Sequence, residues 1–268
     1  MGGSVAERSS RARSLHAAGG KSELDTSVGK ALALLEAFQD AGRSVGVTHL
    51  AATAGLPKST AYRLLGILLD WGLVERSGSG YCLGAHLFEL GNAIPSCGPS
   101  GLREIASPHL MRLYEASHET VHLGVLDGTE VMYVDRLCGR NPPAASRVGV
   151  RVPAESAALG KVILAFSRRE VVARVLARGL QRQSAYTIVE PQQFVEHVRA
   201  IRSAGIAFDR EETFIGVACV AAPVLGPDGT AVAAVSLAGP THRFQPDGFA
   251  DQVRAVTSEI SRELQVSR

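Results

Sequence analysis

One five-residue stretch of the 268-residue chain has the spacing of a catalytic metal site. It reads His118-Glu119-Thr120-Val121-His122 and matches the H-E-x-x-H signature of zinc proteases. That chemistry needs both histidines on one helical face, about 6 Å apart, so that each reaches the same ion. Thr120 and Val121 instead open a strand pattern, in which four residues span about 13 Å. We predict a chance match with no catalytic or metal-binding residue; a metal-dependent hydrolase that uses His118, Glu119 and His122 is the alternative.

A second group of polar residues crowds at the beginning of a predicted helix over residues 57–71. One face of that helix is an apolar stripe at i, i+3, i+4 and i+7, made of Ala61, Leu64, Leu65 and Leu68. Lys58, Ser59, Tyr62 and Arg63 lie opposite, within the first two turns. Backbone N–H groups and the helix dipole favour anions at this end. The pattern therefore predicts an anionic partner here.

The flanking residues supply the other elements of a winged helix-turn-helix. TSVGKALALLEAF has the spacing of an amphipathic helix that begins near Asp25 or Thr26. VTHLAATAG is expected to form a short helix capped by Thr48 and ended by Gly55. LVERSGSGYCLG should give two short strands around a Ser-Gly-Ser-Gly turn, which is a β-hairpin wing. We therefore predict a DNA-binding winged helix-turn-helix over residues 25–84.

A second domain is expected beyond a linker helix and linker over residues 85–99. AHLFELGNAI carries the helical spacing, and SCGPSG then breaks the chain. Over residues 100–268, Asp127-Gly128 predicts a hairpin in TVHLGVLDGTEVMYVDR. Further strands are expected near 147–152, 206–209, 217–225 and 231–238, and helices over 102–116 (disturbed at Pro108), 156–166, 170–178, 191–204 and 247–263. Hairpins with separated helices predict an α+β fold with an antiparallel sheet.

Composition describes a soluble globular protein, with 46% hydrophobic and 20% charged residues. The Gly-, Ser- and Arg-rich residues 1–24 lack the apolar core of a signal peptide and predict a disordered tail. No apolar run reaches a membrane-spanning length, and the four cysteines have no paired spacing. We therefore expect a cytoplasmic protein without membrane contact, cofactor or disulfide. Residues 25–99 carry five Lys/Arg against six Asp/Glu, so bulk charge does not by itself indicate nucleic acid.

Seven stretches occur in the order and spacing of one known family. They are GLPKSTAYRLL, GLVERSGSGYCLG, ETVHLGVLDGTEVMYVDR, ALGKVILAF, AGIAFDREE, GVACVAAPV and AVAAVSLAGP. Over residues 25–265 the chain resembles the IclR family of bacterial transcriptional regulators. The resemblance implies a winged helix-turn-helix, a linker helix and a C-terminal GAF/profilin-like antiparallel-sheet domain that binds an effector. It also implies a homodimer or a dimer of dimers on operator DNA, and no enzymatic activity.

The resemblance also implies an effector pocket on the sheet of the C-terminal domain. Carried over residue by residue, it uses Ala158, Leu159, Asp209, Cys219 and Ser236. Two positions depart from the family pattern, because Glu155 replaces a frequent histidine and Ala238 replaces a second serine. If Glu155 faces the pocket, it should repel carboxylates. Neutral or cationic, aromatic metabolites are then expected to bind better than α-keto acids. The alternative is that Glu155 points to solvent.

The residues thus predict a ligand-responsive regulator whose helix over 57–71 enters the major groove of DNA. Ser59, Thr60, Tyr62 and Arg63 are the candidates for contact with bases, and Lys58 and Arg76 for contact with phosphates. A DNA-binding scaffold without a ligand is a third possibility, which would show no ligand-induced thermal shift. Lys161, which follows a glycine but no phosphate-binding loop, is expected to be a solvated helix residue.

Overall fold

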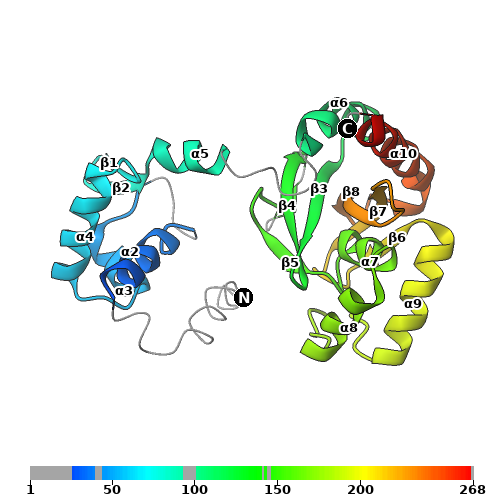
Figure 1. Cartoon of the computed structure of the whole chain (residues 1–268), viewed down its shortest axis with the longest axis horizontal. Helices are drawn as coiled ribbons and strands as arrows, with labels where there is room; N and C mark the ends of the chain where they lie inside the picture. The colour runs from blue at the N-terminus through cyan, green and yellow to red at the C-terminus, as the bar shows by residue number, and fades with distance from the viewer. Residues whose placement is uncertain (1–25, 40–43, 93–100, 141, 144–145, 267–268) are drawn as a thin grey trace. The chain divides into compact units, whose positions relative to one another are not determined.

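The computed structural model describes residues 26–39, 44–92, 101–140, 142–143 and 146–266 (Figure 1). The chain divides between Ile94 and Pro95 into two compact units. The predicted disordered tail, residues 1–24, and the predicted linker residues 93–99 lie outside the described residues. Of the helices that are described, none is both long enough and apolar enough to cross a membrane.

The N-terminal unit contains the predicted winged helix-turn-helix (Figure 1). Its elements are α2 (Ser27–Glu36), α3 (Val47–Thr53), α4 (Lys58–Asp70), β1 (Val74–Ser77), β2 (Gly80–Leu83) and α5 (Ala85–Asn92). The apolar stripe of α4 packs into one core with α2 and α3, in which Leu34, Leu50 and Leu65 are fully buried. Gly55 ends the turn after α3 with φ +67°, a conformation that favours glycine. The core therefore fixes which face of α4 remains exposed.

Two helix starts in this unit differ from the prediction. Helix α3 begins at Val47 after Gly46, and no side chain of the described residues caps it, so Thr48 is a residue of the first turn and not its cap. Pro57 precedes α4 as its N-cap residue with φ −57°, where its missing N–H costs nothing. Both differences are shifts of one or two residues, because local composition defines a helix end less sharply than it defines a helix face.

The C-terminal unit is built on a six-stranded antiparallel sheet of order β5-β4-β3-β8-β7-β6. Its strands are β3 (Thr120–Asp127), β4 (Glu130–Leu137), β5 (Arg151–Pro153), β6 (Ala207–Arg210), β7 (Val217–Leu225) and β8 (Ala231–Pro240). Its helical elements are α6 (Leu102–Ser117), α7 (Ala158–Ala165), α8 (Arg169–Arg178), α9 (Pro191–Ala204), η1 (Pro246–Phe249) and α10 (Ala250–Val266). The predicted α+β class and antiparallel sheet are confirmed.

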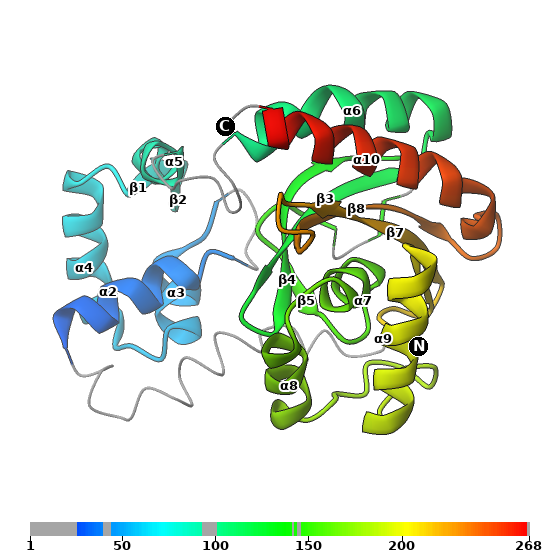
Figure 2. The same ribbon diagram turned by 45° about the vertical axis from the view of Figure 1, so that its right-hand side comes forward.

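Helices cover both faces of this sheet. Helices α6 and α10 lie on one face, and α7, α8 and α9 lie on the other (Figure 2). Side chains along β8 alternate between the two cores: Val235 and Leu237 pack toward α6 and α10, whereas Ala234 packs toward α7. Ser236, two residues after Ala234, therefore points to the same face of the sheet, toward α7. The face toward α7 is the one that carries polar residues.

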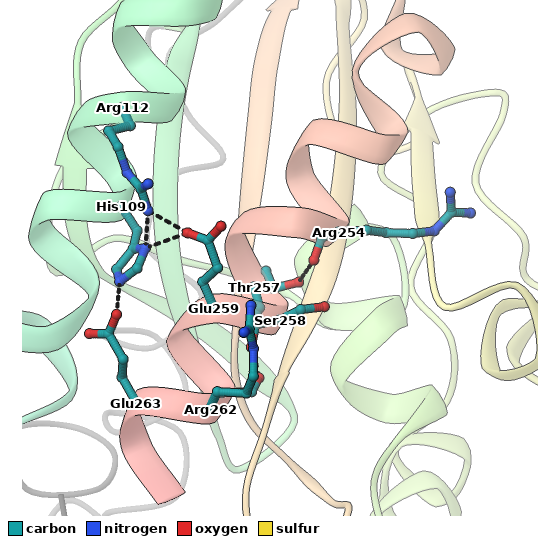
Figure 3. A network of polar contacts seen from close by, with 9 residues as sticks. His109, Arg112, Arg254, Thr257, Ser258, Glu259, Arg262 and Glu263 are labelled. Atoms are coloured by element: carbon teal, nitrogen blue, oxygen red, sulfur yellow. Dashed lines mark hydrogen bonds and ion pairs between the residues drawn. The ribbon is translucent and has the colours of Figure 1, made fainter. Parts of the chain in front are cut away.

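A cluster of charged side chains joins the two helices of the other face (Figure 3). His109 of α6 is buried, with Nδ1 3.1 Å from Oε2 of Glu259 and Nε2 2.9 Å from Oε1 of Glu263, both on α10. Arg112, one turn after His109, forms an ion pair with Glu259. Helix α6 continues through Pro108. This cluster aligns α6 with α10 on the side of the sheet opposite its polar face.

Several predicted elements of this unit have different bounds in the structure. The strand expected near 147–152 is reduced to Arg151–Pro153, because residues 147–150 approach it through a turn around Gly149. The helix expected over 156–166 begins only at Ala158. The C-terminal helix expected over 247–263 is split into η1 and α10. None of these differences changes the order or direction of the strands.

Candidate functional site: a DNA-reading helix and an effector pocket

The exposed face of α4 carries the polar residues that the sequence indicated. Lys58, Ser59, Tyr62 and Arg63 are exposed, with Tyr62 59% accessible, and Thr60 is half-buried. Pro57 provides no side-chain cap, so the first backbone N–H groups of α4 remain available to an anion. Hydroxyl, phenol and guanidinium groups on one helix turn are suited to the edges of bases and to phosphates.

The β1–β2 wing places Arg76 in a defined position. Its guanidinium lies 4.3 Å from the centre of the Tyr81 ring, the residue paired with it across the hairpin. Tyr81 is buried in the core of the unit, which fixes the ring. Stacking on this ring restricts the guanidinium of Arg76 while its charge stays accessible. The wing therefore presents a fixed positive group.

One cavity of the C-terminal unit gathers six of the seven predicted effector residues. It comprises about 450 Å³ of unoccupied space, part of it open to solvent. Little of that space is wide enough for a solvent molecule, so a ligand has to displace side chains on entry. The predicted residues that line it are Ala158, Leu159, Asp209, Cys219, Ser236 and Ala238.

Strand register explains why residues far apart in the sequence meet at this cavity. Ser236 of β8 lies opposite His122 of β3, and Cys219 of β7 lies opposite both Asp209 of β6 and Ala238 of β8. Because alternate residues of a strand point to the same face, these side chains project together toward α7. The sheet supplies the floor, and α7 supplies one wall.

The beginning of α7 forms that wall. Among the described residues, no side chain caps the helix, whose N-cap residue is Ala157. Ala157, Ala158 and Leu159 line the cavity. The uncapped N–H groups and the positive end of the helix dipole therefore lie beside it.

The remaining walls come from residues that the sequence did not assign to the pocket or left undecided. The ring of His122 stacks on Tyr133, with centroids 4.5 Å apart, and its Nε2 is hydrogen-bonded to the hydroxyl of Ser146. Thr213 and Phe214 also line the cavity. Strand alternation would have placed Tyr133 on this face, but no pattern of residues indicates which face carries the cavity.

Burial controls the charge of these groups. Burial, followed by the charge of Arg136, lowers the pKa of His122 to about 3, so the ring is neutral at physiological pH. Burial raises the pKa of the Tyr133 phenol, and the neighbouring Cys219 raises it further. Burial also raises the pKa of the Cys219 thiol, with Asp209 as the next cause. Burial also raises the pKa of Asp209, opposed by hydrogen bonds and by Lys161. The cavity thus holds hydrogen-bonding groups of low charge.

Glu155 does not line this cavity, so its predicted place in the pocket is wrong. Its side chain is fully buried, which also excludes the alternative that it points to solvent. Its Oε1 accepts hydrogen bonds from Nη2 of Arg178 at 2.6 Å and from the backbone N–H of Gln181 at 3.3 Å. Glu155 therefore ties the connection between β5 and α7 to the end of α8, and it gives no reason to expect that the pocket repels carboxylate ligands.

Lys161 is a second residue whose environment was predicted wrongly. Its side chain is 0% exposed, and its ammonium pairs with the carboxylate of Glu212. The partner lies 51 residues away in sequence, in the connection between β6 and β7. A lysine on an otherwise apolar helix is usually solvated, and only the tertiary fold supplies this partner.

The H-E-x-x-H stretch does not have the geometry of a helical zinc site. Helix α6 ends at Ser117, His118 is its C-cap residue with φ +53°, and strand β3 begins at Thr120. Glu119 forms a bidentate ion pair with Arg243, at 2.6 and 3.0 Å. In the described part of the chain, no three His, Cys, Asp or Glu side chains are grouped to hold a metal ion.

A winged helix-turn-helix joined to a unit with a small-molecule cavity defines a ligand-responsive transcriptional regulator. The IclR helix-turn-helix model matches residues 27–78, and the model of the C-terminal domain of bacterial IclR regulators matches residues 98–262. The chain belongs to the IclR family of bacterial transcriptional regulators. It binds DNA through the first unit and a small-molecule effector through the second.

Similar proteins agree with this assignment. The transcriptional repressor IclR of Escherichia coli is 34% identical over 82% of this chain and 82% of its own length. The IclR structure from Thermotoga maritima has a TM-score of 0.76 at 32% identity and covers 88% of this chain and 98% of that one. An IclR homologue from Microbacterium hydrocarbonoxydans, complexed with 4-hydroxybenzoate, has a TM-score of 0.78 at 25% identity, with coverage of 89% and 99%. The regulator KdgR of Dickeya chrysanthemi is 33% identical over 83% of this chain and 73% of its own length.

Proposed function

We propose that the cavity beside α7 is the effector pocket and that its ligand is a small aromatic carboxylic acid that carries a hydroxyl group. The observation that supports this most is the convergence of Ala158, Leu159, Asp209, Cys219, Ser236 and Ala238 on one cavity. Its lining combines apolar and aromatic side chains with hydrogen-bonding groups that converge on one cavity, which is typical of a small-ligand site.

The parts of such a ligand match separate walls of the cavity. The described lining residues include no lysine or arginine, so a carboxylate would be held by the uncapped N–H groups at the beginning of α7. The rings of His122, Tyr133 and Phe214 are suited to an aromatic ring. The carboxyl group of Asp209 is an acceptor for a hydroxyl. The homologue that binds 4-hydroxybenzoate gives one example of this ligand class.

We expect calorimetric titration to detect binding of 4-hydroxybenzoate, with benzoate and 4-hydroxybenzyl alcohol each at least about tenfold weaker. Each analogue lacks one polar group of 4-hydroxybenzoate. The protein group that would pair with it is then left buried without a hydrogen bond, which weakens binding by about 1–3 kcal/mol. Ala238→Leu should fill the cavity and weaken 4-hydroxybenzoate at least about tenfold.

Glu155→His tests separately whether Glu155 takes part in the choice of ligand. Since Glu155 faces Arg178 and not the cavity, the exchange should leave the order of ligand preference unchanged. Preferential binding of pyruvate or glyoxylate would contradict the aromatic class. Unchanged affinity in Ala238→Leu would contradict the pocket itself.

For the DNA-binding unit we propose contacts to bases from Ser59, Thr60, Tyr62 and Arg63, and contacts to phosphates from Lys58 and Arg76. The exposure of α4 and the fixed position of Arg76 support these roles. We propose domain limits of 25–84 for this unit, 85–99 for the linker helix and linker, and 100–268 for the effector-binding domain. The division into two units supports a boundary within the linker.

We propose that the chain acts as a homodimer or a dimer of dimers. Large apolar side chains stand uncovered on the N-terminal unit, among them Val28, Leu32, Trp71 and Phe88. Val28 and Leu32 are four residues apart on the same face of α2, and such neighbouring exposed apolar side chains are typical of an interaction surface. Sedimentation at micromolar concentration should give twice or four times the mass of the 28.2 kDa chain. A monomer with full operator affinity would contradict this.

We also propose that the protein has no catalytic activity and acts in the cytoplasm, where operator DNA is found. His118 lies at the end of helix α6 and His122 lies in strand β3, which argues against a metal-dependent hydrolase. Curated relatives such as the repressor IclR of Escherichia coli and the regulator KdgR of Dickeya chrysanthemi favour the same conclusion.

A further inference from the structure

A buried ion pair lies directly behind the proposed effector pocket. Lys161 projects from α7, with no accessible surface on its side chain, and its ammonium binds Oε1 of Glu212. In the preceding turn of the same helix, Ala158 and Leu159 line the cavity. The pair therefore connects the helix that forms one wall of the pocket to the connection between β6 and β7.

That connection, residues 211–216, contributes another wall. Thr213 and Phe214 line the cavity, and Thr213 donates a hydrogen bond to the hydroxyl of Ser156 at 3.1 Å. Glu211 and Gly216, at its two ends, both have positive φ, +65° and +83°. For Glu211 this conformation is uncommon and has to be held by its surroundings.

The same segment is attached to Asp209. Oδ1 of Asp209 accepts hydrogen bonds from the backbone N–H groups of Glu212 at 2.7 Å and Thr213 at 3.3 Å. Among the described residues, the charged or titratable groups whose pKa values respond to the charge of Lys161 include Glu212, Asp209 of β6, His197 of α9 and Cys219 of β7. Lys161 is thus linked to Asp209, which lines the pocket, through Glu212: the side chain of Glu212 pairs with Lys161, and its backbone N–H donates to Asp209.

Stability alone is a weak explanation for this pair. Replacing a buried ion pair by apolar residues is often neutral or stabilising, because desolvation offsets the attraction. The second carboxylate oxygen of Glu212, Oε2, is buried and has no hydrogen-bond partner among the described residues. A pair selected for stability would satisfy that oxygen.

We propose that Lys161 and Glu212 are positioning residues of the effector pocket, which hold residues 211–216 against the cavity and keep a positive charge beside Asp209. Although Lys161 does not line the pocket, its charge then favours the ionised form of the Asp209 carboxyl group, which accepts a hydrogen bond from the ligand. This inference depends on the proposed location of the pocket for its meaning, but its test uses the protein without effector.

The test is the titration of the Asp209 carboxyl group by ¹³C NMR in the full-length protein, with the signal assigned through Asp209→Asn. In Lys161→Met, which keeps a side chain of similar length, the midpoint should rise by about one pH unit or more, because the nearby cation is removed. Arg199→Met removes an exposed positive charge from α9 and should leave the midpoint unchanged. A purely structural role for Lys161 would not move this midpoint selectively.

Glu212→Gln provides an independent variant if Lys161→Met does not fold. It removes an anion near Asp209 and frees Lys161 to act on Asp209 alone, so the midpoint should fall. A midpoint within a few tenths of a unit of wild type in Lys161→Met overturns the proposal. If only Glu212→Gln folds, an unchanged midpoint there overturns it instead. If no effector binds in the calorimetric titrations, the NMR midpoints of Asp209 are still measurable. The proposed ligand class and the proposed role of Lys161 and Glu212 can therefore be contradicted independently.

Discussion

Replacing Gly160 by alanine should destabilise the effector-binding unit by about 3 kcal/mol or more and abolish effector binding. A Cβ atom at Gly160 would lie 2.3 Å from both Cα and the carbonyl oxygen of Ala154. These are backbone atoms, so a rotamer change cannot relieve the overlap. Helix α7 would have to move away from Ala154, and the wall formed by Ala158 and Leu159 would move with it.

Gly91→Ala is the matched control for this exchange. Gly91 also lies in a helix, α5, but apart from its chain neighbours and the backbone of that helix, no atom of the described residues lies within 4 Å of an added Cβ. Alanine is the better helix former, so this variant should be stabilised by roughly 0.5–1 kcal/mol. Differential scanning calorimetry should show the two glycines shifting stability in opposite directions. Equal stability of Gly160→Ala and wild type would contradict the close packing of α7 on Ala154.

Arg63→Ala should weaken specific DNA binding by about 1–3 kcal/mol and relax sequence preference at one position per half-site. Arg63 is exposed on the polar face of α4, where a guanidinium can bind the edge of a guanine in two places. Lys58→Ala should weaken all sequences alike. It should also lower the salt dependence of binding by about one unit for each phosphate that the variant no longer neutralises.

The measurement begins with sequences selected from a randomised DNA pool by the wild-type protein. Gel-shift titrations across salt concentrations would then compare Arg63→Ala and Lys58→Ala. Arg169→Ala, an exposed arginine of α8 in the other unit, changes net charge equally and should not alter sequence preference. Wild-type affinity in both α4 variants would exclude this face of the helix from the DNA interface.

The sequence alone determined the helix-turn-helix and its exposed face. A stripe of period 3.6 needs no knowledge of the fold, since Ala61, Leu64 and Leu65 have to be buried on whatever lies beside them. The rejection of a zinc site was equally local, because Thr120 and Val121 favour a strand on their own. Helix ends were less well defined, as Thr48 shows, because several nearby residues can begin a helix.

The C-terminal sheet and the residues carried over from the family pattern followed from sequence as well. Asp209, Cys219 and Ser236 were assigned by resemblance, and strand register then explains why they share one cavity. Tyr133 and Phe214 were missed because strand alternation and loop position do not reveal which face of a sheet is hollow.

Only the tertiary structure decided the environment of the charged residues. Glu155 was expected to face the pocket or solvent, and Lys161 was expected to be solvated. Both side chains are fully buried. Their partners, Arg178 and Glu212, lie 23 and 51 residues further along the chain. A buried charge is tolerated when an opposite charge and hydrogen bonds are brought to it. Such a pairing depends on the packing of distant elements, and no local pattern of residues encodes it.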